Sequence, residues 1–509
     1  MSASDPRPNL AQGTPFSADS PSKPLNIHVV GVCGTGMGSL AGLLRELGHQ
    51  VSGSDTAFDP PMGPALASWG VRCLEGFDPK HLEPTPDLVV IGNVCRANNP
   101  EARAAIDGGL PYTHIAGALA RFALSDASPL VVTGTHGKTT TTALCAHLLD
   151  RAGLQPGFLI GGLPKNFPKS FRAAGPRRLG SVGASRRRTP FALEGDEYDT
   201  AFFEKTAKFL NYPVEVVVIT SIEHDHIDIY PTLEGYLEAF RKLVERVPED
   251  GLIVANAADA HVRDVVRTAR ADVAYFALQA EDTGPVAPHW LAAPAQTGPE
   301  GSSFDLFAGG VFVGRLATAL PGRHNLKNAL SAIAACAQGF GMPLSSVGPA
   351  LASFEGVRRR QELLGTPDGV RVYDDFAHHP TAVRETLLAL RSKHPDGKLI
   401  AVFEPRSATA CRSLHQADYA EAFGAADVVL LAPLGRSNVD RAEALDLQLL
   451  AHELTSRGKQ AECLADLAAV EQRAVALAAP GDSLALLSNG AFGGLTRRVV
   501  ERLALRQAT

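Results

Sequence analysis

Short apolar runs alternate along the chain with longer stretches whose apolar residues recur at helical spacing. "NIHVVGV" predicts a first strand over residues 26–32, and "MGSLAGLLRELG" predicts the helix that follows it over 37–48. "QVSGSD", "DLVVIGN" and "PYTHIAG" continue the pattern to about residue 124. This alternation of strands and helices is typical of α/β domains with mostly parallel sheets.

Two further units follow the first. The second starts at the strand over residues 129–132 and continues through "FALEGD", "VEVVVIT", "GLIVAN" and "VAYFAL". A polar, Pro/Gly-rich stretch from 281 to 303 leads to a predicted hairpin, "FDLFAGGVFVGRL", and "HNLKNALSAIAACAQGF" and "PLSSVGPALASF" predict two closing helices. The third unit begins near Gly356 and holds "RVYDDFA", "LIAVFEP", "DVVLLAP" and "SLALLSNG". We therefore expect domains at 25–124, 125–355 and 356–509.

Two segments depart from this pattern. Residues 1–24 are polar and rich in Pro and Ser, without the apolar core of a signal peptide, which predicts a disordered tail. Residues 168–190 are basic and rich in Gly, Ser and Pro, which predicts a mobile insertion that buries little. A basic loop could contact an anionic ligand, but a solvated insertion is the favoured interpretation.

Composition narrows the class of protein. The 509 residues are 45% hydrophobic and 20% charged, as in a soluble globular protein, and the net charge of −6 gives no electrostatic footprint for nucleic acid. The chain contains no apolar run long enough to span a bilayer, so no membrane insertion is expected. Its seven cysteines form no close pairs, which favours free thiols in a reducing cytoplasm.

The segment "VVTGTHGKTTTTAL", residues 131–144, resembles a phosphate-binding loop with altered spacing. Gly137, Lys138 and Thr139 match the end of G-x-x-x-x-G-K-[ST], but the first glycine position falls on Val132, and Gly134 is the only earlier glycine. A strand precedes the loop and a helix follows it, which is the context that such a loop requires. We therefore predict a nucleotide site with Lys138 on the outer phosphates and the Thr139 hydroxyl on Mg²⁺; the alternative is a glycine turn with a solvated lysine.

A second glycine-rich turn follows the first strand. Gly31, Gly34, Gly36 and Gly38 open the first helix, and Asp55 ends the second strand, where a ribose hydroxyl is often held. Alone, this pattern would suggest NAD. Two phosphate-binding turns in one chain instead suggest an enzyme that uses ATP on a substrate that is itself a nucleotide conjugate.

Acidic clusters follow two strands of the second unit. "LEGDEYDTAFF" follows one, and "TSIEHDHIDIY" follows the next, with Glu223, Asp225, His226 and Asp228. Mg²⁺ prefers oxygen ligands, so an imidazole would be an unusual partner for it, while zinc is disfavoured because no H-E-x-x-H motif or nearby cysteine is present. We favour a metal role for these clusters over solvated loop ends.

Taken together, the motifs resemble one family. GTHGKTTT, E-x-D-E, DHIDIY, GRHNLKNALSAIAA, GVRRRQE and DDFAHHP stand in the order found in the ATP-dependent Mur ligases of bacterial cell-wall synthesis, over about residues 26 to 500. The resemblance implies a three-domain α/β architecture. It comprises a Rossmann-like UDP-sugar-binding domain, a P-loop ATPase-like central domain that binds ATP, and a Rossmann-like C-terminal domain that binds the acceptor.

Within the family, three segments indicate the acceptor. "EGDEYDTAFFEKTAKFLNY", "FEPRSATA" and "LLSNGAFGG" are most similar to members that join L-alanyl-γ-D-glutamyl-meso-diaminopimelate to UDP-N-acetylmuramate in peptidoglycan recycling. Members that attach free L-alanine are the alternative. A folate polyglutamate ligase would not need the first glycine-rich unit, and a nucleotide-switched binding protein would lack the chemistry. The resemblance further implies ATP and Mg²⁺, a cytoplasmic location, and a monomer or weak dimer.

The resemblance also implies roles for individual residues. For ATP these are Gly134, Thr135, His136, Gly137, Lys138, Thr139, Thr140, Asn325, Asn328, Arg359 and Asp374; for the metal, Thr139, Glu194 and His226. For the UDP-sugar they are Gly34, Thr35, Gly36, Met37, Ser54, Asp55 and Asn93; for the peptide, Arg406 and His379. The catalytic residues implied are Lys138, His226, Arg359 and His379. The resemblance also places Asp374, Asp375, His378 and His379 on the nucleotide and acceptor side of the C-terminal domain.

Three of these assignments need comment. Arg359 would face the γ-phosphate, with Arg358 and Arg360 as neighbouring alternatives, and His379 would act as the base. Arg241 stands where several relatives have a carbamylated lysine, so no carbamylated lysine is expected.

Overall fold

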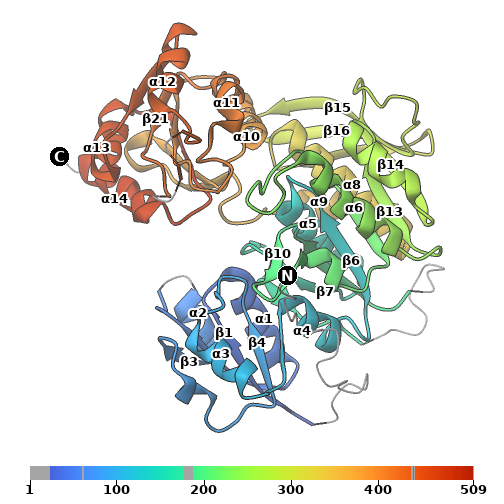
Figure 1. Cartoon of the computed structure of the whole chain (residues 1–509). Helices are drawn as coiled ribbons and strands as arrows, with labels where there is room; N and C mark the ends of the chain where they lie inside the picture. Colours follow the sequence, from blue (N-terminus) through green and yellow to red (C-terminus); the bar gives the residue numbers. More distant parts are fainter. Residues whose placement is uncertain (1–22, 60–61, 177–186, 437–438, 441, 508–509) are drawn as a thin grey trace, which may run out of the picture.

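The chain forms three sheet-centred bodies, with the central one lying between the other two (Figure 1). The structure is a computed structural model that describes residues 23–59, 62–176, 187–436, 439–440 and 442–507. Most of the predicted N-terminal tail, residues 1–22, lies outside the described residues. The predicted α/β fold is confirmed, with one large sheet in each body and a separate two-stranded sheet.

The N-terminal sheet is fully parallel. Its five strands, in spatial order, are β3 (Arg72–Glu75), β2 (Gln50–Asp55), β1 (Asn26–Val30), β4 (Leu88–Ile91) and β5 (Tyr112–Thr113). The helices are α1 (Thr35–Glu46), α2 (Met62–Ser68), α3 (Pro100–Asp107) and α4 (Ile115–Phe122). Because β1 lies between β2 and β4, the loops after these strands meet at the point where the strand order reverses, which is where ligands bind in such sheets.

The central sheet has ten strands. In spatial order they are β17 (Val311–Thr318), β16 (Gly301–Ala308), β15 (Trp290–Gly298), β14 (Asp272–Leu278), β13 (Leu252–Asn256), β12 (Val216–Ile219), β6 (Ser128–Thr133), β9 (Pro190–Gly195), β7 (Gly157–Leu159) and β8 (Phe171–Arg172). The run from β15 to β7 is parallel and its centre is fully buried, which fits the continuous Val/Ile/Leu runs of the sequence. The predicted hairpin is β16–β17. The stretch 281–303, expected to be polar loop, contributes β15, whose backbone pairs with β14 on one edge and with β16 on the other.

Helices α5 (Lys138–Arg151) and α8 (Arg323–Phe340) pack against the central sheet, and α6 (Leu233–Arg246), α7 (Ala260–Val265) and α9 (Val347–Ala352) complete this body. Most side chains of α5 and α8 are buried. A Cβ added to Gly137, at the start of α5, would lie 2.3 Å from Asn328 Oδ1 on α8. The two helices therefore bring the phosphate-binding loop directly against the "HNLKN" segment.

The segment 168–190 differs from its prediction. Phe171 is buried, and its ring packs edge-on against Trp69 of the N-terminal body at 4.8 Å between centroids. The prediction that the segment buries little is therefore wrong at its start, since one aromatic side chain is enough to anchor it. Residues 177–186 lie outside the described residues. A hairpin of β10 (Asp199–Ala201) and β11 (Glu204–Ala207) makes a second contact through Phe203, whose ring lies 5.3 Å from that of Tyr112.

The C-terminal sheet has six strands: β18 (Glu362–Gly365), β19 (Arg371–Asp375), β23 (Ser483–Leu487), β20 (Leu399–Phe403), β21 (Val428–Leu431) and β22 (Gln460–Cys463). All except β18 run parallel. Its helices are α10 (Pro380–Lys393), α11 (Gln416–Ala422), α12 (Leu447–Ser456), α13 (Leu467–Leu477) and α14 (Leu495–Gln507). The N-terminal end of α10 faces the central body, so the connection over 353–361 brings two bodies around one cavity.

Candidate nucleotide and metal site

The shortened loop joins β6 to α5 through two glycines with positive φ. Gly134 has φ +120° and Gly137 has φ +81°, and a Cβ on Gly134 would lie 2.3 Å from Thr220 Oγ1. Glycine is therefore required at both positions. No side chain caps the start of α5, so its first N–H groups remain available to an anion.

Lys138 is held by its own loop and by Glu197. Its Nζ donates to the Gly134 carbonyl at 2.7 Å and lies 2.9 Å from both carboxylate oxygens of Glu197. Burial alone would raise the pKa of Glu197, but Lys138 and then His226 hold it down at about 2. Burial alone would lower the pKa of Lys138, but Glu197 and Asp196 outweigh this effect and raise it. In this structure Glu197 is thus the ion-pair partner of Lys138, whose ammonium group the sequence analysis assigned to the outer phosphates.

Three oxygen- and nitrogen-bearing groups meet at the first turn of α5. The Thr139 hydroxyl donates to Glu194 at 3.0 Å, and Arg360 Nη2 donates to Thr139 Oγ1 at 3.1 Å. Glu194 also accepts from the Gly161 N–H at 2.6 Å. Burial, and then the nearby Asp196, raise the pKa of Glu194 although Arg360 opposes them. A partly buried carboxylate beside a hydroxyl is a donor set that suits Mg²⁺.

The structure selects a different arginine from the one predicted. Arg360, not Arg359, points to the phosphate-binding loop. The Arg359 guanidinium turns into the C-terminal body, where it donates to the Ser488 and Gly490 carbonyls at 2.7 and 2.6 Å. In this structure Arg360 is therefore the better candidate for the phosphate, and the assignment of Arg359 stays a prediction.

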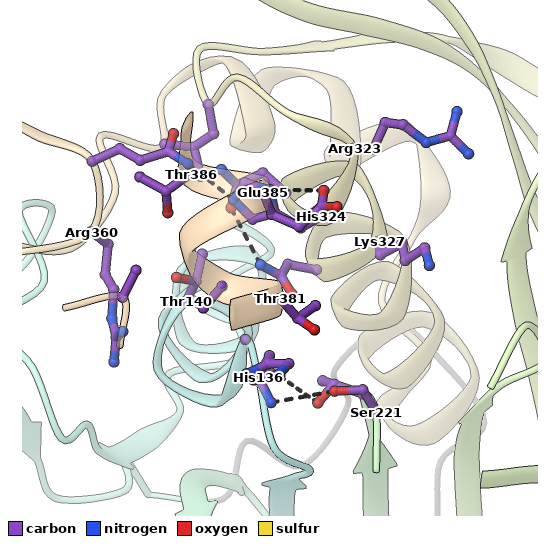
Figure 2. Close-up of a pocket in the computed structure, with 18 of the residues that line it drawn as sticks. His136, Thr140, Ser221, Arg323, His324, Lys327, Arg360, Thr381, Glu385 and Thr386 are labelled. Atoms are coloured by element: carbon purple, nitrogen blue, oxygen red, sulfur yellow. Dashed lines mark hydrogen bonds and ion pairs between the residues drawn. The ribbon is translucent and has the colours of Figure 1, made fainter. Parts of the chain in front are cut away.

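A cavity of about 330 Å³ opens above the loop (Figure 2). It is lined from four segments: the loop, the carboxyl ends of central strands, α8, and the start of α10 with its connection. Asn325 and Asn328 line it and are hydrogen-bonded to each other at 3.2 Å. Arg323 and Lys327 lie on one side and Arg360 on the other (Figure 2). His136 and Thr140 also face it, whereas Gly134 and Thr135 support the loop from below.

Asp374 does not line this cavity, but Asp375 does. Asp375 accepts from the N–H groups of Gln361 at 2.6 Å and Ala377 at 2.7 Å, which fixes it at the end of β19. Asp374 points away, with Arg359 Nε 3.4 Å from it, and burial raises its pKa to about 6. Successive residues of a strand face opposite sides, so only one of the pair can reach the nucleotide cavity, and of the two aspartates Asp375 is the one that lines it.

His226 is paired with Glu197 and not with Glu194. Its Nε2 lies 3.1 Å from Glu197 Oε1, and it has a positive φ of 52°. Glu197 therefore bridges Lys138 and His226, a role that was not assigned to it from the sequence. Its position as the fourth residue of "EGDE" was the available signal.

His379 caps α10 and is buried. Its Nδ1 accepts from the Thr381 N–H at 3.4 Å and lies 3.5 Å from Glu223 Oε2. Burial, and then His136, lower its pKa to about 3. A group with this pKa accepts a proton poorly at neutral pH, which argues against the predicted role of His379 as the base.

The predicted UDP-sugar residues surround the start of α1. Asp55 accepts from the Cys33 N–H at 2.7 Å and so fixes the glycine-rich turn. Ser54 is fully buried and donates to the buried Glu101, so it supports the turn and cannot contact a ligand as predicted. Gly34 caps α1, followed by Thr35, Gly36 and Met37 in its first turn, and Asn93 lies exposed after β4.

Arg406 follows β20 at the end of the C-terminal sheet. Its side chain is 44% exposed and lies over two glycines: a Cβ on Gly435 would come within 2.9 Å of it, and a Cβ on Gly490 within 2.3 Å. Its Nη1 lies 3.8 Å from Glu404. Because neither glycine has a side chain, the aliphatic part of Arg406 can lie against the backbone at both positions, while its guanidinium remains accessible.

Comparison with known proteins matches all three bodies to one family. The description "Mur ligase family, catalytic domain" matches residues 26–126, "Mur ligase middle domain" matches 132–336, and "Mur ligase, glutamate ligase domain" matches 359–490. The chain belongs to the Mur ligase family. It is therefore an ATP-dependent ligase that forms an amide bond, and the alternative of a binding protein without chemistry is wrong.

Relatives with both candidate acceptors are similar to this chain. The UDP-N-acetylmuramate–L-alanyl-γ-D-glutamyl-meso-2,6-diaminoheptandioate ligase of Escherichia coli is 37% identical over 94% of this chain and 98% of its own length. The UDP-N-acetylmuramate–L-alanine ligase of an Arthrobacter species is 35% identical over 85% of this chain and 86% of its own. The crystal structure of a murein peptide ligase from Psychrobacter arcticus matches with a TM-score of 0.70 at 32% identity, over 94% of this chain and 99% of that one. Among the described residues, no helix combines the length and the apolar character needed to cross a membrane.

Proposed function

We propose that this chain joins the tripeptide L-alanyl-γ-D-glutamyl-meso-diaminopimelate to the lactyl carboxylate of UDP-N-acetylmuramate, with ATP and Mg²⁺, in peptidoglycan recycling. The observation that carries the proposal is the convergence of Lys138, Thr139, Glu194 and Arg360 at the start of α5, beside a cavity that the C-terminal body closes. Phosphoryl transfer depends on such positioned charges.

The tripeptide is favoured over free L-alanine by two observations. The tripeptide ligase of E. coli is 37% identical over 94% of this chain, whereas L-alanine ligases that match 94–95% of the chain are 33–34% identical to it. A tripeptide also carries carboxylates that L-alanine lacks, and Arg406 offers an accessible guanidinium that can bind one with two hydrogen bonds.

In the proposed reaction, a lactyl carboxylate oxygen attacks the γ-phosphorus of ATP, and the bond from phosphorus to the bridging oxygen of ADP breaks. The product is an acyl phosphate, which the peptide amine then attacks, so that phosphate leaves and the amide forms. Lys138 and Arg360 would stabilise the negative charge that spreads over the transferring phosphoryl oxygens. The C-terminal body, joined through the start of α10, would exclude water from the acyl phosphate.

Thr139 and Glu194 are the residues that fit the expected Mg²⁺, because both present oxygen at the phosphate end of α5. When bound there, Mg²⁺ would supply positive charge that neutralises the phosphate oxygens. His226, expected from the sequence to be a direct ligand, contacts Glu197 in this structure, so we propose that it acts on the metal site through Glu197. The glycine-rich turn at α1 would hold the diphosphate of UDP, with Asp55 fixing the turn. We also propose a cytoplasmic enzyme that is a monomer or weak dimer, which sedimentation would test.

One substrate panel tests the proposal. Purified chain receives ATP and Mg²⁺ with UDP-N-acetylmuramate, with candidate amines, or with both, and ADP release and product mass are measured. We expect ADP release only when both UDP-N-acetylmuramate and an amine are present, and faster release with the tripeptide than with L-alanine. ADP release without either substrate would contradict the ligase, and preference for L-alanine would contradict the acceptor.

A further inference from the structure

His136, Glu223 and His379 form a compact group that the proposed reaction does not use. One ligand atom from each of them lies within 4.8 Å of the others. His136 belongs to the phosphate-binding loop, Glu223 follows β12, and His379 caps α10, so the group joins the central and C-terminal bodies. It is separate from the pairs Thr139–Glu194 and Glu197–His226.

The spacing of these atoms matches coordination better than hydrogen bonding. Glu223 Oε2 lies 3.4 Å from His136 Nε2 and 3.5 Å from His379 Nδ1. An N–H···O hydrogen bond would be about 2.7–3.2 Å. Two ligand atoms that are each about 2.0–2.1 Å from a tetrahedral Zn²⁺ stand about 3.3 Å apart. Both separations to Glu223 are therefore close to an edge of such a tetrahedron.

An unsatisfied polar atom supports the same conclusion. The buried Nε2 atom of His136, which faces Glu223, has no hydrogen-bond partner among the described residues. His379 Nδ1 has only the long cap bond from Thr381, which a metal would replace. The Thr381 hydroxyl donates to Glu223 Oε2 at 2.6 Å, and a second partner of this kind orients a ligating carboxylate. Glu223 is 35% exposed and lines the cavity, which provides a route of entry.

We propose that His136, Glu223 and His379 bind a borderline divalent transition metal such as Zn²⁺, which links the central and C-terminal bodies across the nucleotide cavity. Two imidazoles and one carboxylate suit Zn²⁺, whereas Mg²⁺ prefers six oxygens and competes poorly here. The bound ion would hold the start of α10 against the phosphate-binding loop. It would thereby slow the separation of the central and C-terminal bodies through which nucleotide enters and leaves the cavity. This consequence rests on the proposed function.

Metal binding is measured on the chelator-treated full chain in excess Mg²⁺ without nucleotide, by equilibrium dialysis with Zn²⁺ and by the visible absorption of tetrahedral Co²⁺. We expect one Zn²⁺ per chain, and at least about 10-fold weaker binding in His136→Ala, Glu223→Gln and His379→Asn, since even an outer partner has an effect of that size. Asparagine retains the cap of α10 and glutamine can still accept from Thr381, so both variants should fold. His452→Ala, an exposed histidine on α12, is the matched control and should bind normally.

The site would be overturned if no Zn²⁺ binds in excess Mg²⁺, or if His379→Asn binds Zn²⁺ as tightly as the parent. Loss of binding in His226→Ala would also overturn it, because the ion would then lie at the Glu197–His226 pair. The link between bodies is tested by trypsin cleavage after Arg358, which is exposed in the connection. Zn²⁺ should slow this cleavage in the parent and not in His379→Asn, and equal cleavage rates would overturn the link. These measurements need no substrate, so they stand even if the ligase assay fails.

Discussion

The Lys138 ammonium group lies 2.9 Å from both carboxylate oxygens of Glu197, and Glu197 is at the same time 3.1 Å from His226. A phosphate that binds this loop must therefore compete with a buried carboxylate for its principal cation. The release of Lys138 from Glu197 would couple nucleotide binding to a change at His226. This relationship makes the roles of Lys138 and Glu197 separable by experiment.

Lys138→Ala should lower the ligation rate by about 100-fold or more, the size of effect seen when one charge-stabilising donor is removed. Its melting temperature should also fall, since Glu197 is left buried with only His226 as a partner. Lys80→Ala, an exposed lysine of the N-terminal body, is the control and should match the parent. Adding Glu197→Gln to Lys138→Ala should restore part of the melting temperature but none of the rate. Near-normal rates in folded Lys138→Ala would contradict the nucleotide loop.

Arg360→Ala should reduce the rate by about 100-fold, because Arg360 is the arginine directed at Thr139. Arg359→Ala should act mainly on stability, since it removes two hydrogen bonds to the carbonyls of Ser488 and Gly490 inside the C-terminal body. Steady-state kinetics and thermal melting of the two variants distinguish these effects. A larger loss of rate in Arg359→Ala at equal stability would restore the assignment made from the sequence.

Glu194→Ala should raise the Mg²⁺ concentration needed for half-maximal rate, by about 10-fold or more, because it removes an oxygen beside Thr139. His226→Ala should have a smaller effect, since His226 contacts Glu197 and not Glu194. Rates are measured over a Mg²⁺ titration at saturating ATP. If both variants keep the Mg²⁺ dependence of the parent, the ion is held elsewhere, and Glu197 becomes the first residue to substitute.

Asp374→Asn should stabilise the chain at neutral pH. Burial raises the pKa of Asp374 from 3.8 to about 6, so the folded state favours the protonated carboxyl, and the stability contributed by protonation is lost as pH rises from about 4 to about 6. Asparagine imitates the protonated form. Above pH 6 the variant should gain on the order of 2–3 kcal/mol over the parent, and the gain should vanish toward pH 4.

Thermal melting of Asp374→Asn and the parent across this pH range measures the effect. A gain that grows as the pH falls would show the opposite sign and would contradict the burial argument. In the same assays Asp375→Asn should weaken ATP binding more than Asp374→Asn, because Asp375 is the member of the pair that lines the cavity.

The sequence was sufficient to predict the elements of the site but not the directions of their side chains. Strand, glycine loop and helix at 128–151 follow from local chemistry, and the structure has them as β6 and α5. In contrast, Arg359 and Arg360 are adjacent in sequence, and only the contacts of the folded chain show which of them reaches the loop. The same holds for Asp374 and Asp375, which a strand directs to opposite faces. Glu197 is the last residue of E-x-D-E, but its contacts with Lys138 and His226 could not be predicted because those residues are distant in sequence.

Two features of the polar segments depend on long-range packing and could not be predicted from local sequence. β15 lies in a stretch that reads as loop, and it forms because β14 and β16 present free edges to it. Phe171 lies in a segment of basic and small residues, where no periodicity marks it, yet it is buried against Trp69 of another body. Such contacts depend on how the bodies meet, which a local pattern does not encode.

The identity of the acceptor can be tested through Arg406, whose side chain lies against Gly435 and Gly490. The chemistry at the phosphates is the same for L-alanine and for the tripeptide, so only groups farther out can distinguish them. Arg406→Ala should raise the KM for the tripeptide by about 10-fold or more and leave the KM for ATP unchanged, because a charge-assisted pair is worth roughly 1.5–3 kcal/mol. Arg457→Ala, an exposed arginine at the end of α12, is the matched control.

Gly490→Ala gives an independent test that keeps the guanidinium. Its methyl group would stand 2.3 Å from Arg406 Cδ and Nε, so the Arg406 side chain must move from its present position. If Arg406 binds a peptide carboxylate, Gly490→Ala should raise the tripeptide KM in the same direction as Arg406→Ala, and the double variant should be no worse than Arg406→Ala alone. Additive losses in the double variant would show that Gly490 acts through something other than Arg406. An unchanged tripeptide KM in Arg406→Ala, with a raised KM for ATP, would move this arginine from the peptide to the nucleotide.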